Sequence, residues 1–220
     1  MSEIKKMWTI FSFGADCVLE MRALLPKGGD SQQPKSIIKH FRGQDHQGTE
    51  SLREAFECEA LHLNQMGYNL YVVMNPIKPD FPCKSAVRDD DIDYRDLLLI
   101  DIDRAFNTQC PASDDELAAT KTVADAVSQY LLDRGWGHPI LVMSGNGYHL
   151  YYNLRGVSNT PEAKSFCEMV LKGLASKFNT PKAQIDISVF NASRITKVPG
   201  TVMRKGDETA ERPYRKAVVL

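Results

Sequence analysis

An apolar run that ends in two aspartates, L-L-L-I-D-I-D at residues 97–103, restricts the possible folds more than any other stretch of this sequence. Four consecutive apolar residues predict a buried strand over residues 97–102. Side chains two positions apart on a strand share one face, so Asp101 and Asp103 project together. The sequence therefore predicts a buried strand with two carboxylates on one face of its end.

The segments that follow this strand predict a β-α-β-β-α-β order. In sequence, they are a strand at 97–102, a helix at 114–134, strands at 140–143 and 148–154, a helix at 160–178 and a strand at 185–190. Gly145 and Gly147 mark a hairpin between the two middle strands. Thr160 caps the second helix, with Pro161 at its first position. This order is typical of an RRM-like (ferredoxin-like) sheet, in which the first and third strands are central neighbours.

The first 76 residues predict a small α/β module. We expect a strand at 8–13, a helix at 15–25, a helix that Thr49 caps and Gly67 ends, and a strand at 69–74. Residues 77–96 contain two prolines and the run Asp89-Asp90-Asp91, which favours a solvated linker. The expected fold class is α+β (α/β). The chain would form one catalytic domain, 1–220, with modules at 1–76 and 97–220 and a carboxyl-terminal hairpin in 201–220.

Composition excludes several classes of protein. With 27 Lys and Arg, 28 Asp and Glu, a net charge of −1 and 43% apolar residues, the chain is not disordered, collagen-like or a polybasic coat protein. Its five cysteines include no C-x-x-C pair, which argues against a zinc knuckle and a disulfide framework. No signal peptide and no bilayer-length apolar run is evident, so we expect a cytoplasmic protein with no membrane partner.

Two neighbouring carboxylates suggest a metal site. Asp101 and Asp103 would repel each other and become partly neutral unless a divalent cation lay between them. Mg²⁺ and Mn²⁺ prefer oxygen ligands of this kind. The alternative is a structural pair at a strand end.

The stretch S-G-N-G-Y-H at residues 144–149 suggests a phosphate site. Two glycines in a turn allow backbone amides to approach a phosphate closely. The alternation along the next strand places His149 on a polar face of the sheet, where it would donate to an anionic oxygen. The alternative is a core histidine with its hydrogen bonds satisfied by the protein.

A third stretch, I-D-I followed by S-R-I-T-K, combines an acid with two bases. A charged Asp186 inside an apolar strand costs several kcal/mol unless it is paired or metal-bound. Arg194 and Lys197 would supply the fixed positive charge that a triphosphate needs. The alternative is an ion pair between Asp186 and Arg194.

Together these stretches resemble the three motifs of the archaeo-eukaryotic primase superfamily. The similarity is greatest to the primase-polymerases of phages, plasmids and other mobile elements, and it covers essentially the whole chain. The segment G-Y-N-L-Y-V-V-M-N-P at residues 67–76 resembles the strand that precedes the first motif in these proteins.

The resemblance implies a role for each matched residue. It implies that three carboxylates are catalytic and bind two Mg²⁺ or Mn²⁺ ions: Asp101, Asp103 and Asp186. It implies that five residues contact the incoming nucleotide: Ser144, Gly145, His149, Arg194 and Lys197. Many members carry a zinc-binding insertion, but this chain has no cysteine cluster, so no zinc is expected. Members are often joined to a helicase, which makes a helicase domain or subunit an expected partner.

The activity implied is template-directed synthesis or extension of primers from dNTPs or NTPs. DNA template and primer would contact local basic clusters: Lys35, Lys39, Arg42, Arg204 and Lys205. A solvated basic tail is the alternative for the last two. Two other functions stay open: a metal-dependent nuclease or phosphohydrolase, and a non-catalytic RRM-like module that stacks nucleic-acid bases on exposed aromatic residues such as Tyr151.

Overall fold

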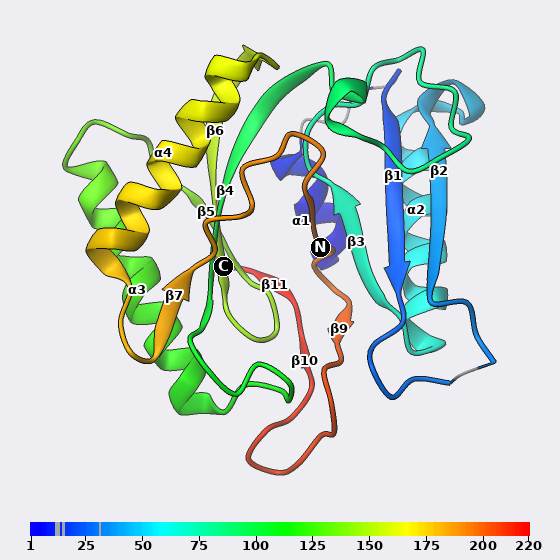
Figure 1. The fold of residues 1–220 in the computed structure, drawn as a ribbon. Helices are drawn as coiled ribbons and strands as arrows, with labels where there is room; N and C mark the ends of the chain where they lie inside the picture. Colours follow the sequence, from blue (N-terminus) through cyan, green and yellow to red (C-terminus); the bar gives the residue numbers. More distant parts are fainter. Residues whose placement is uncertain (12–13, 15, 31) are drawn as a thin grey trace.

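The computed structural model describes residues 1–11, 14, 16–30 and 32–220, which form two large antiparallel sheets, a two-stranded sheet and several helices (Figure 1). The helices are α1 (Glu3–Ile10), α2 (Gly48–Gln65), α3 (Asp114–Leu132) and α4 (Pro161–Phe178), with short 3-10 helices η1 (Gly43–Asp45) and η2 (Asp89–Asp91). This mixture of helices and sheets confirms the α+β class. Among the helices described, none has the length and apolar character needed to cross a membrane.

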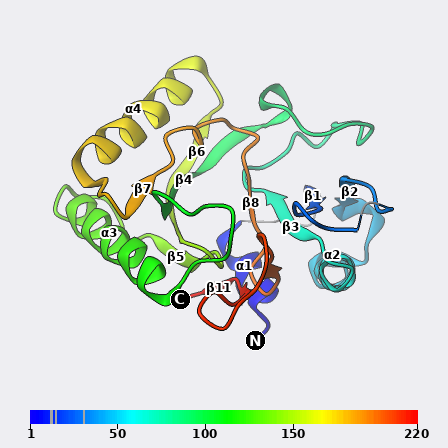
Figure 2. The same ribbon diagram turned by 60° about the horizontal axis from the view of Figure 1, so that its bottom comes forward.

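The larger sheet has the order β11-β5-β6-β4-β7. Its strands are β4 (Tyr94–Arg104), β5 (Ile140–Met143), β6 (Tyr148–Ser158), β7 (Ala183–Ile185) and β11 (Val218–Val219). Helices α3 and α4 cover one face of this sheet (Figure 2). The first and third strands of the predicted unit, β4 and β6, are central neighbours, so the β-α-β-β-α-β plan is confirmed. Strand β11 extends the sheet beside β5.

The smaller sheet has the order β2-β1-β3-β8, and α2 packs against it. Its strands are β1 (Val18–Leu24), β2 (Ser36–Arg42), β3 (Asn69–Val73) and β8 (Ile195–Lys197). Strand β8 comes from the second half of the chain, yet Lys197 pairs with Tyr71 of β3. The two sheets are therefore not built from separate halves of the sequence.

Two predictions near the amino terminus are wrong. Residues 8–10 of the expected strand belong to α1, because Ser2 caps the helix and Ile4, Met7 and Ile10 are buried at helical spacing. The expected helix at 15–25 is instead strand β1. In β1, the apolar Leu19, Met21 and Ala23 alternate with Glu20 and Arg22, a strand pattern that the sequence analysis missed. Residues 12, 13 and 15 of these two predictions lie outside the described residues.

Two smaller expectations also differ from the structure. Thr49 does not cap α2, which begins one residue earlier, at Gly48, without a side-chain cap on its amino terminus. Strand β2 was not predicted, since it is an edge strand with mostly exposed or half-buried residues and therefore lacks a strong apolar pattern.

The segment 77–96 is packed rather than solvated. Ile77, Phe81, Val87 and Ile92 are buried in one cluster, and Ile77 forms a β-bridge with Ile92. The acidic run forms η2, where Asp89 accepts hydrogen bonds from the backbone and hydroxyl of Ser193. Apolar residues scattered among prolines and acids therefore anchor this segment. The division into modules at 1–76 and 97–220 stays a prediction.

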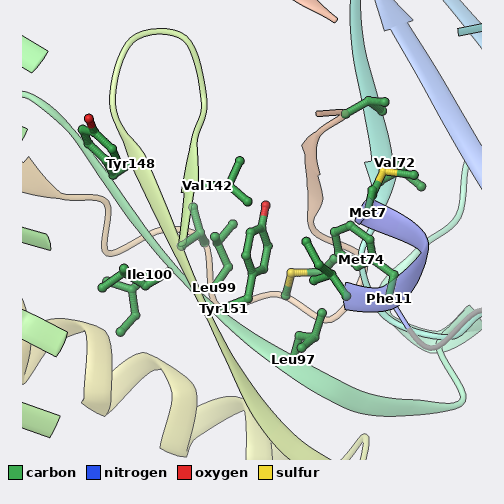
Figure 3. Close-up of a cluster of buried hydrophobic side chains, with 14 of the residues drawn as sticks. Met7, Phe11, Val72, Met74, Leu97, Leu99, Ile100, Val142, Tyr148 and Tyr151 are labelled. Carbon is green, nitrogen blue, oxygen red and sulfur yellow. The ribbon is translucent and has the colours of Figure 1, made fainter. Parts of the chain in front are cut away.

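Part of the core lies between the two sheets and includes α1, and the rest lies between the larger sheet and helices α3 and α4. Figure 3 shows Met7 and Phe11 next to Met74, Leu97 and Tyr151, so residues from α1, β4 and β6 meet in one apolar cluster. Burying side chains of this size contributes roughly 1.5–3 kcal/mol each. This shared core holds the two sheets at a fixed distance along one side.

The predicted carboxyl-terminal hairpin is present and is fastened to α3. It consists of β9 (Val202–Met203) and β10 (Arg215–Lys216). Glu116, in the first turn of α3, accepts hydrogen bonds from Arg212 at 2.7 and 2.8 Å and from Arg104 at 3.0 Å. These partners, Arg212 first, lower the pKa of Glu116 to about 2. Arg104 is 1% exposed, so Glu116 is a charge partner for a buried cation.

We expect Glu116→Gln to lower the free energy of unfolding by about 2 kcal/mol at pH 7, because it removes the nearer carboxylate from the buried Arg104 guanidinium and leaves only Asp103, 3.9 Å away. A carboxyl with a depressed pKa stabilises the fold above its unfolded pKa and loses that contribution as the pH falls toward 2. The difference between wild type and variant should therefore shrink between about pH 4.5 and pH 2. Denaturant melts across this range measure it. A difference that does not depend on pH would contradict the assignment.

Candidate active site

A cavity of about 290 Å³ lies between the two sheets, beyond the end of their shared core. Its polar and charged lining residues come from both sheets and from β9 and its loop: Tyr71, Asp101, Asp103, Ser144, Asn146, His149, Asp186, Arg194, Thr196, Lys197 and Lys205. The apolar part of the wall includes Leu24, Leu99 and Met203. Eight residues predicted from the sequence to bind metal, nucleotide or nucleic acid therefore share one cavity.

Strand register brings the three carboxylates to one wall of this cavity. Asp101 of β4 lies opposite His149 of β6, while Asp103 lies opposite Gln184 of β7. On the other side of β4, the Asp186 backbone N–H donates to the Asp101 carbonyl at 2.9 Å. Asp101 is thus placed between His149 and Asp186. The prediction that Asp101 and Asp103 share a face holds, since both line the cavity.

Asp186 follows a strand rather than lying inside one. Strand β7 ends at Ile185, and the Asp186 carboxylate accepts the backbone N–H of Ser188 at 2.7 Å, a local turn that stops the strand. The expected strand over 185–190 is therefore wrong. The alternative of an Asp186–Arg194 ion pair is also absent from the described part of the chain. Arg194 instead donates to the Ser188 carbonyl at 2.7 Å.

The carboxylates are electrostatically strained. Burial, together with the charges of Asp103 and Asp186, raises the pKa of Asp101 to about 7, although Arg194 and Lys205 act in the opposite direction. The Lys205 ammonium is 3.9 Å from Asp103. Positive charge placed among the three acids would relieve this repulsion.

The donor set suits a hard divalent cation. All three acids offer carboxylate oxygens, which Mg²⁺ and Mn²⁺ prefer, and Mg²⁺ commonly takes one or two carboxylates and completes its shell with substrate phosphates. Within the described residues, no group of three or more His, Cys, Asp or Glu side chains is arranged so that it could hold a metal ion by itself. A cation at this wall would therefore need further ligands, such as phosphate oxygens.

His149 is buried and neutral. It is 6% exposed, and its Nδ1 lies 3.0 Å from the Tyr151 hydroxyl and 3.2 Å from the Thr196 hydroxyl. Its Nε2 lies 3.4 Å from the Asp101 carboxylate. Burial, aided by Lys197, lowers the pKa of His149 to about 4. Both ring nitrogens therefore have polar neighbours within the protein, as the core-histidine alternative requires, and a contact of Nε2 with a nucleotide stays a prediction.

The hairpin between β5 and β6 is fixed in one conformation. Gly145 has φ +108°, and a Cβ at Gly147 would lie 2.2 Å from the Ile102 carbonyl oxygen, so both positions require glycine. Ser144 and Asn146 line the cavity, whereas Gly145 does not, and its N–H points to the Met143 sulfur at 3.0 Å. The turn thus presents side chains at this wall, and contact of a nucleotide with the Gly145 amide stays a prediction.

Asn146 is a candidate that the sequence analysis did not select. Its Oδ1 accepts the Ala112 N–H at 2.8 Å, which fixes the side-chain amide. Its Nδ2 is buried and has no hydrogen-bond partner among the described residues. An unsatisfied buried donor costs about 1–3 kcal/mol, so a ligand acceptor in the cavity would be favoured there. The only sequence signal was a polar residue between two glycines.

Cations line the cavity as well as acids. Lys197 is 2% exposed, and burial and the nearby Arg204 lower its pKa to about 7. Its ammonium lies 5.5 Å from the centre of the Tyr71 ring. Arg194 and Lys205 add two more positive charges. An anion entering the cavity would favour the charged form of Lys197.

The predicted nucleic-acid contacts are divided between two places. Lys205 lines the cavity, and Arg204 is next to it on the loop after β9. Lys39 and Arg42 lie on β2, away from the cavity lining, with Lys35 just ahead of that strand. Lys39 is 3.3 Å from Glu59, and Arg42 donates to the Phe81 carbonyl at 2.8 Å. Their contact with DNA stays a prediction.

The alternative of an RRM-like module that stacks nucleic-acid bases on Tyr151 needs this ring to be exposed. Tyr151 is 2% exposed, packs edge-on against Phe11 with ring centres 5.6 Å apart, and hydrogen-bonds His149. The second sheet covers the face on which an RRM-like module would expose its aromatic residues. Tyr151 therefore cannot act as an exposed stacking platform.

Comparison with known proteins gives matches in structure alone. No protein-family model and no curated protein matches the sequence. The primase-polymerase AEP domain of cyanophage S-2L superposes with a TM-score of 0.55 at 12% identity, over 99% of this chain and 88% of that one. Primase RepB′ has a TM-score of 0.51 at 12% identity, over 99% of this chain and 55% of that one, so this chain spans about half of RepB′.

A third match is the polymerase domain of Mycobacterium tuberculosis ligase D in complex with DNA. It has a TM-score of 0.55 at 16% identity, over 97% of this chain and 78% of that one. All three similarities extend over nearly the whole of this chain, both sheets included. The chain therefore has the fold of the archaeo-eukaryotic primase superfamily.

Proposed function

We propose that this chain is a DNA primase-polymerase, a template-directed nucleotidyltransferase that makes or extends primers from nucleoside triphosphates. The observation that carries the proposal is a single cavity lined both by three carboxylates and by neutral or cationic donors. The carboxylates are those of Asp101, Asp103 and Asp186, while His149 and Lys197 are buried donors. A triphosphate needs both kinds of group.

Asp101, Asp103 and Asp186 would hold two divalent ions, Mg²⁺ or Mn²⁺. Such ions supply charge neutralisation and lower the pKa of the attacking primer hydroxyl. No protein general base is required by this arrangement.

The remaining side chains would bind and orient the triphosphate. Ser144, Asn146 and His149 offer donors along one wall, and Arg194 and Lys197 offer positive charge. Burial makes such hydrogen bonds stronger than in water, because water competes less for the phosphate oxygens. The reaction would join the primer 3′-hydroxyl oxygen to the α-phosphate and release pyrophosphate.

Primer extension on a gel tests the proposal. Incubating the chain with a primed DNA template, dNTPs and Mg²⁺ or Mn²⁺ should lengthen the primer. A shortened primer would instead identify a nuclease that uses the same acids. A shifted but unaltered band would identify a non-catalytic DNA-binding protein. Omitting the labelled primer and supplying NTPs or dNTPs tests synthesis from the template alone.

We expect Asn146→Asp to raise the KM for dNTP roughly tenfold, because it replaces an N–H donor with a negatively charged oxygen while keeping the bond to the Ala112 N–H. The shape of the side chain is unchanged, but its new charge is buried, so we expect a lower melting temperature in the absence of nucleotide. Steady-state primer extension measures the KM, and a thermal melt checks the fold. Asn153→Asp, on the exposed part of β6, is the matched control and should leave the KM unchanged. Equal effects of the two substitutions would remove Asn146 from the site.

A further inference from the structure

A second cavity, of about 310 Å³, adjoins the one that holds the carboxylates. The two share four lining residues: Leu24, Tyr71, Met203 and Lys205. The second cavity is bounded by the loop after β1, the loop after β9 and Gln109 in the loop after β4. Figure 1 shows β9 between the loop after β1 and the loop after β4. The two cavities are thus neighbours with a common wall. Asp101 and Asp186 line the first cavity and not the second.

The lining of the second cavity is cationic and contains no acid among the described residues. Lys27, Arg204 and Lys205 contribute the charge, and Asn69 is the main neutral polar residue. One guanidinium nitrogen of Arg204, Nη1, is buried without a hydrogen-bond partner in the described part of the chain. An unpartnered buried donor of this kind favours an anionic ligand.

The common wall is largely apolar, and Tyr71 contributes an aromatic ring to it. Leu24 and Met203 lie on the same wall, and Leu25 and Pro26 continue the apolar surface into the second cavity. A surface that combines an aromatic ring and aliphatic side chains with nearby cations suits a chain of stacked bases linked by phosphates.

We propose that the second cavity binds the single-stranded DNA template, with its phosphates against Lys27 and Arg204 and a base against the Tyr71 wall. This inference rests on the proposed function, because it places the templating base beside the nucleotide cavity. The competing surface is β2, but both of its predicted cations have partners: Lys39 contacts Glu59, and Arg42 contacts the Phe81 carbonyl. In the cavity, Lys205 is near Asp103, but Arg204 keeps a buried nitrogen without a partner among the described residues and is better placed to contact a phosphate.

Fluorescence anisotropy with a labelled single-stranded thymidine oligonucleotide tests the inference without metal or nucleotide. Lys27→Ala and Arg204→Ala should each weaken binding roughly fivefold, and each should reduce the salt slope by about 0.7, since each removes one phosphate contact. Lys172→Ala, on the exposed surface of α4, changes the net charge equally and should leave affinity unchanged. Affinities within twofold of wild type for both cavity variants would overturn the proposal, as would an equal loss in the control.

A second measurement separates this inference from the proposed function. Lys27 is outside the nucleotide cavity, so Lys27→Ala should bind dATP with Mn²⁺ as tightly as wild type. If wild type binds no nucleotide, the proposed function fails while the DNA result still stands. Photocrosslinking with 5-iododeoxyuridine in the oligonucleotide should label Tyr71 or Met203. Labelling of β2 instead would overturn the proposed location.

Discussion

Replacing Asp101 by asparagine is expected to abolish nucleotide addition and at the same time to stabilise the folded chain. Activity should fall by at least ~10³-fold, because an ion that supplies several kcal/mol of transition-state stabilisation loses a ligand. Stability should rise by about 1 kcal/mol, because the neutral amide removes a carboxylate that Asp103 and Asp186 repel. Primer extension and thermal melts of one preparation measure both effects.

The stability gain should depend on pH in a defined direction. An acid whose folded pKa is raised, here to about 7, destabilises the fold increasingly as the pH rises from about 4 to 7. In EDTA, the melting temperatures of wild type and Asp101→Asn should therefore converge near pH 4 and differ most above pH 7. Asp93→Asn, at an exposed position just before β4, should change neither activity nor melting temperature. A destabilised but active Asp101→Asn would refute the metal-binding role.

The second half of the fold could be predicted because its signals are local. Ser113 and Glu116 form a capping box at α3, Thr160 and Pro161 begin α4, and the glycines at 145 and 147 define the hairpin. Alternation along β4 and β6 was enough to place Asp101 and His149 on one face. These features need no information from distant parts of the chain.

Features that depend on distant contacts could not be predicted in the same way. Strand β8 joins β3 through a pairing between residues far apart in the sequence, so the sequence did not show that Lys197 would be buried between two sheets. Strand β1 buries Glu20 within its polar alternation, through hydrogen bonds with Val87 and His40 that are distant in the sequence. The orientation of the Asn146 amide is set by the Ala112 N–H, more than thirty residues away, which donates to its Oδ1. This contact leaves Nδ2 without a partner among the described residues.

His149→Ala is expected to raise the KM for dNTP ~10²-fold, with a smaller change in kcat. The imidazole is neutral near pH 7 because burial lowers its pKa to about 4. Two hydroxyls beside Nδ1, from Tyr151 and Thr196, orient the ring so that Nε2 donates into the cavity. A hydrogen bond to a charged phosphate oxygen contributes about 1.5–3 kcal/mol, which corresponds to a factor of about 10 to 150. Steady-state primer extension at varied dNTP concentration separates the KM from kcat.

Tyr151→Phe is the matched control for this substitution. It keeps the ring and its packing against Phe11, and it leaves Thr196 as a hydroxyl donor to Nδ1, 3.2 Å away. The KM should therefore rise less than about fivefold, since one orienting donor remains. Because His149 is already neutral, its contribution should not vary with pH between about 6 and 8. A KM that increases more for Tyr151→Phe than for His149→Ala would mean that the tyrosine hydroxyl, and not the imidazole, contacts the triphosphate.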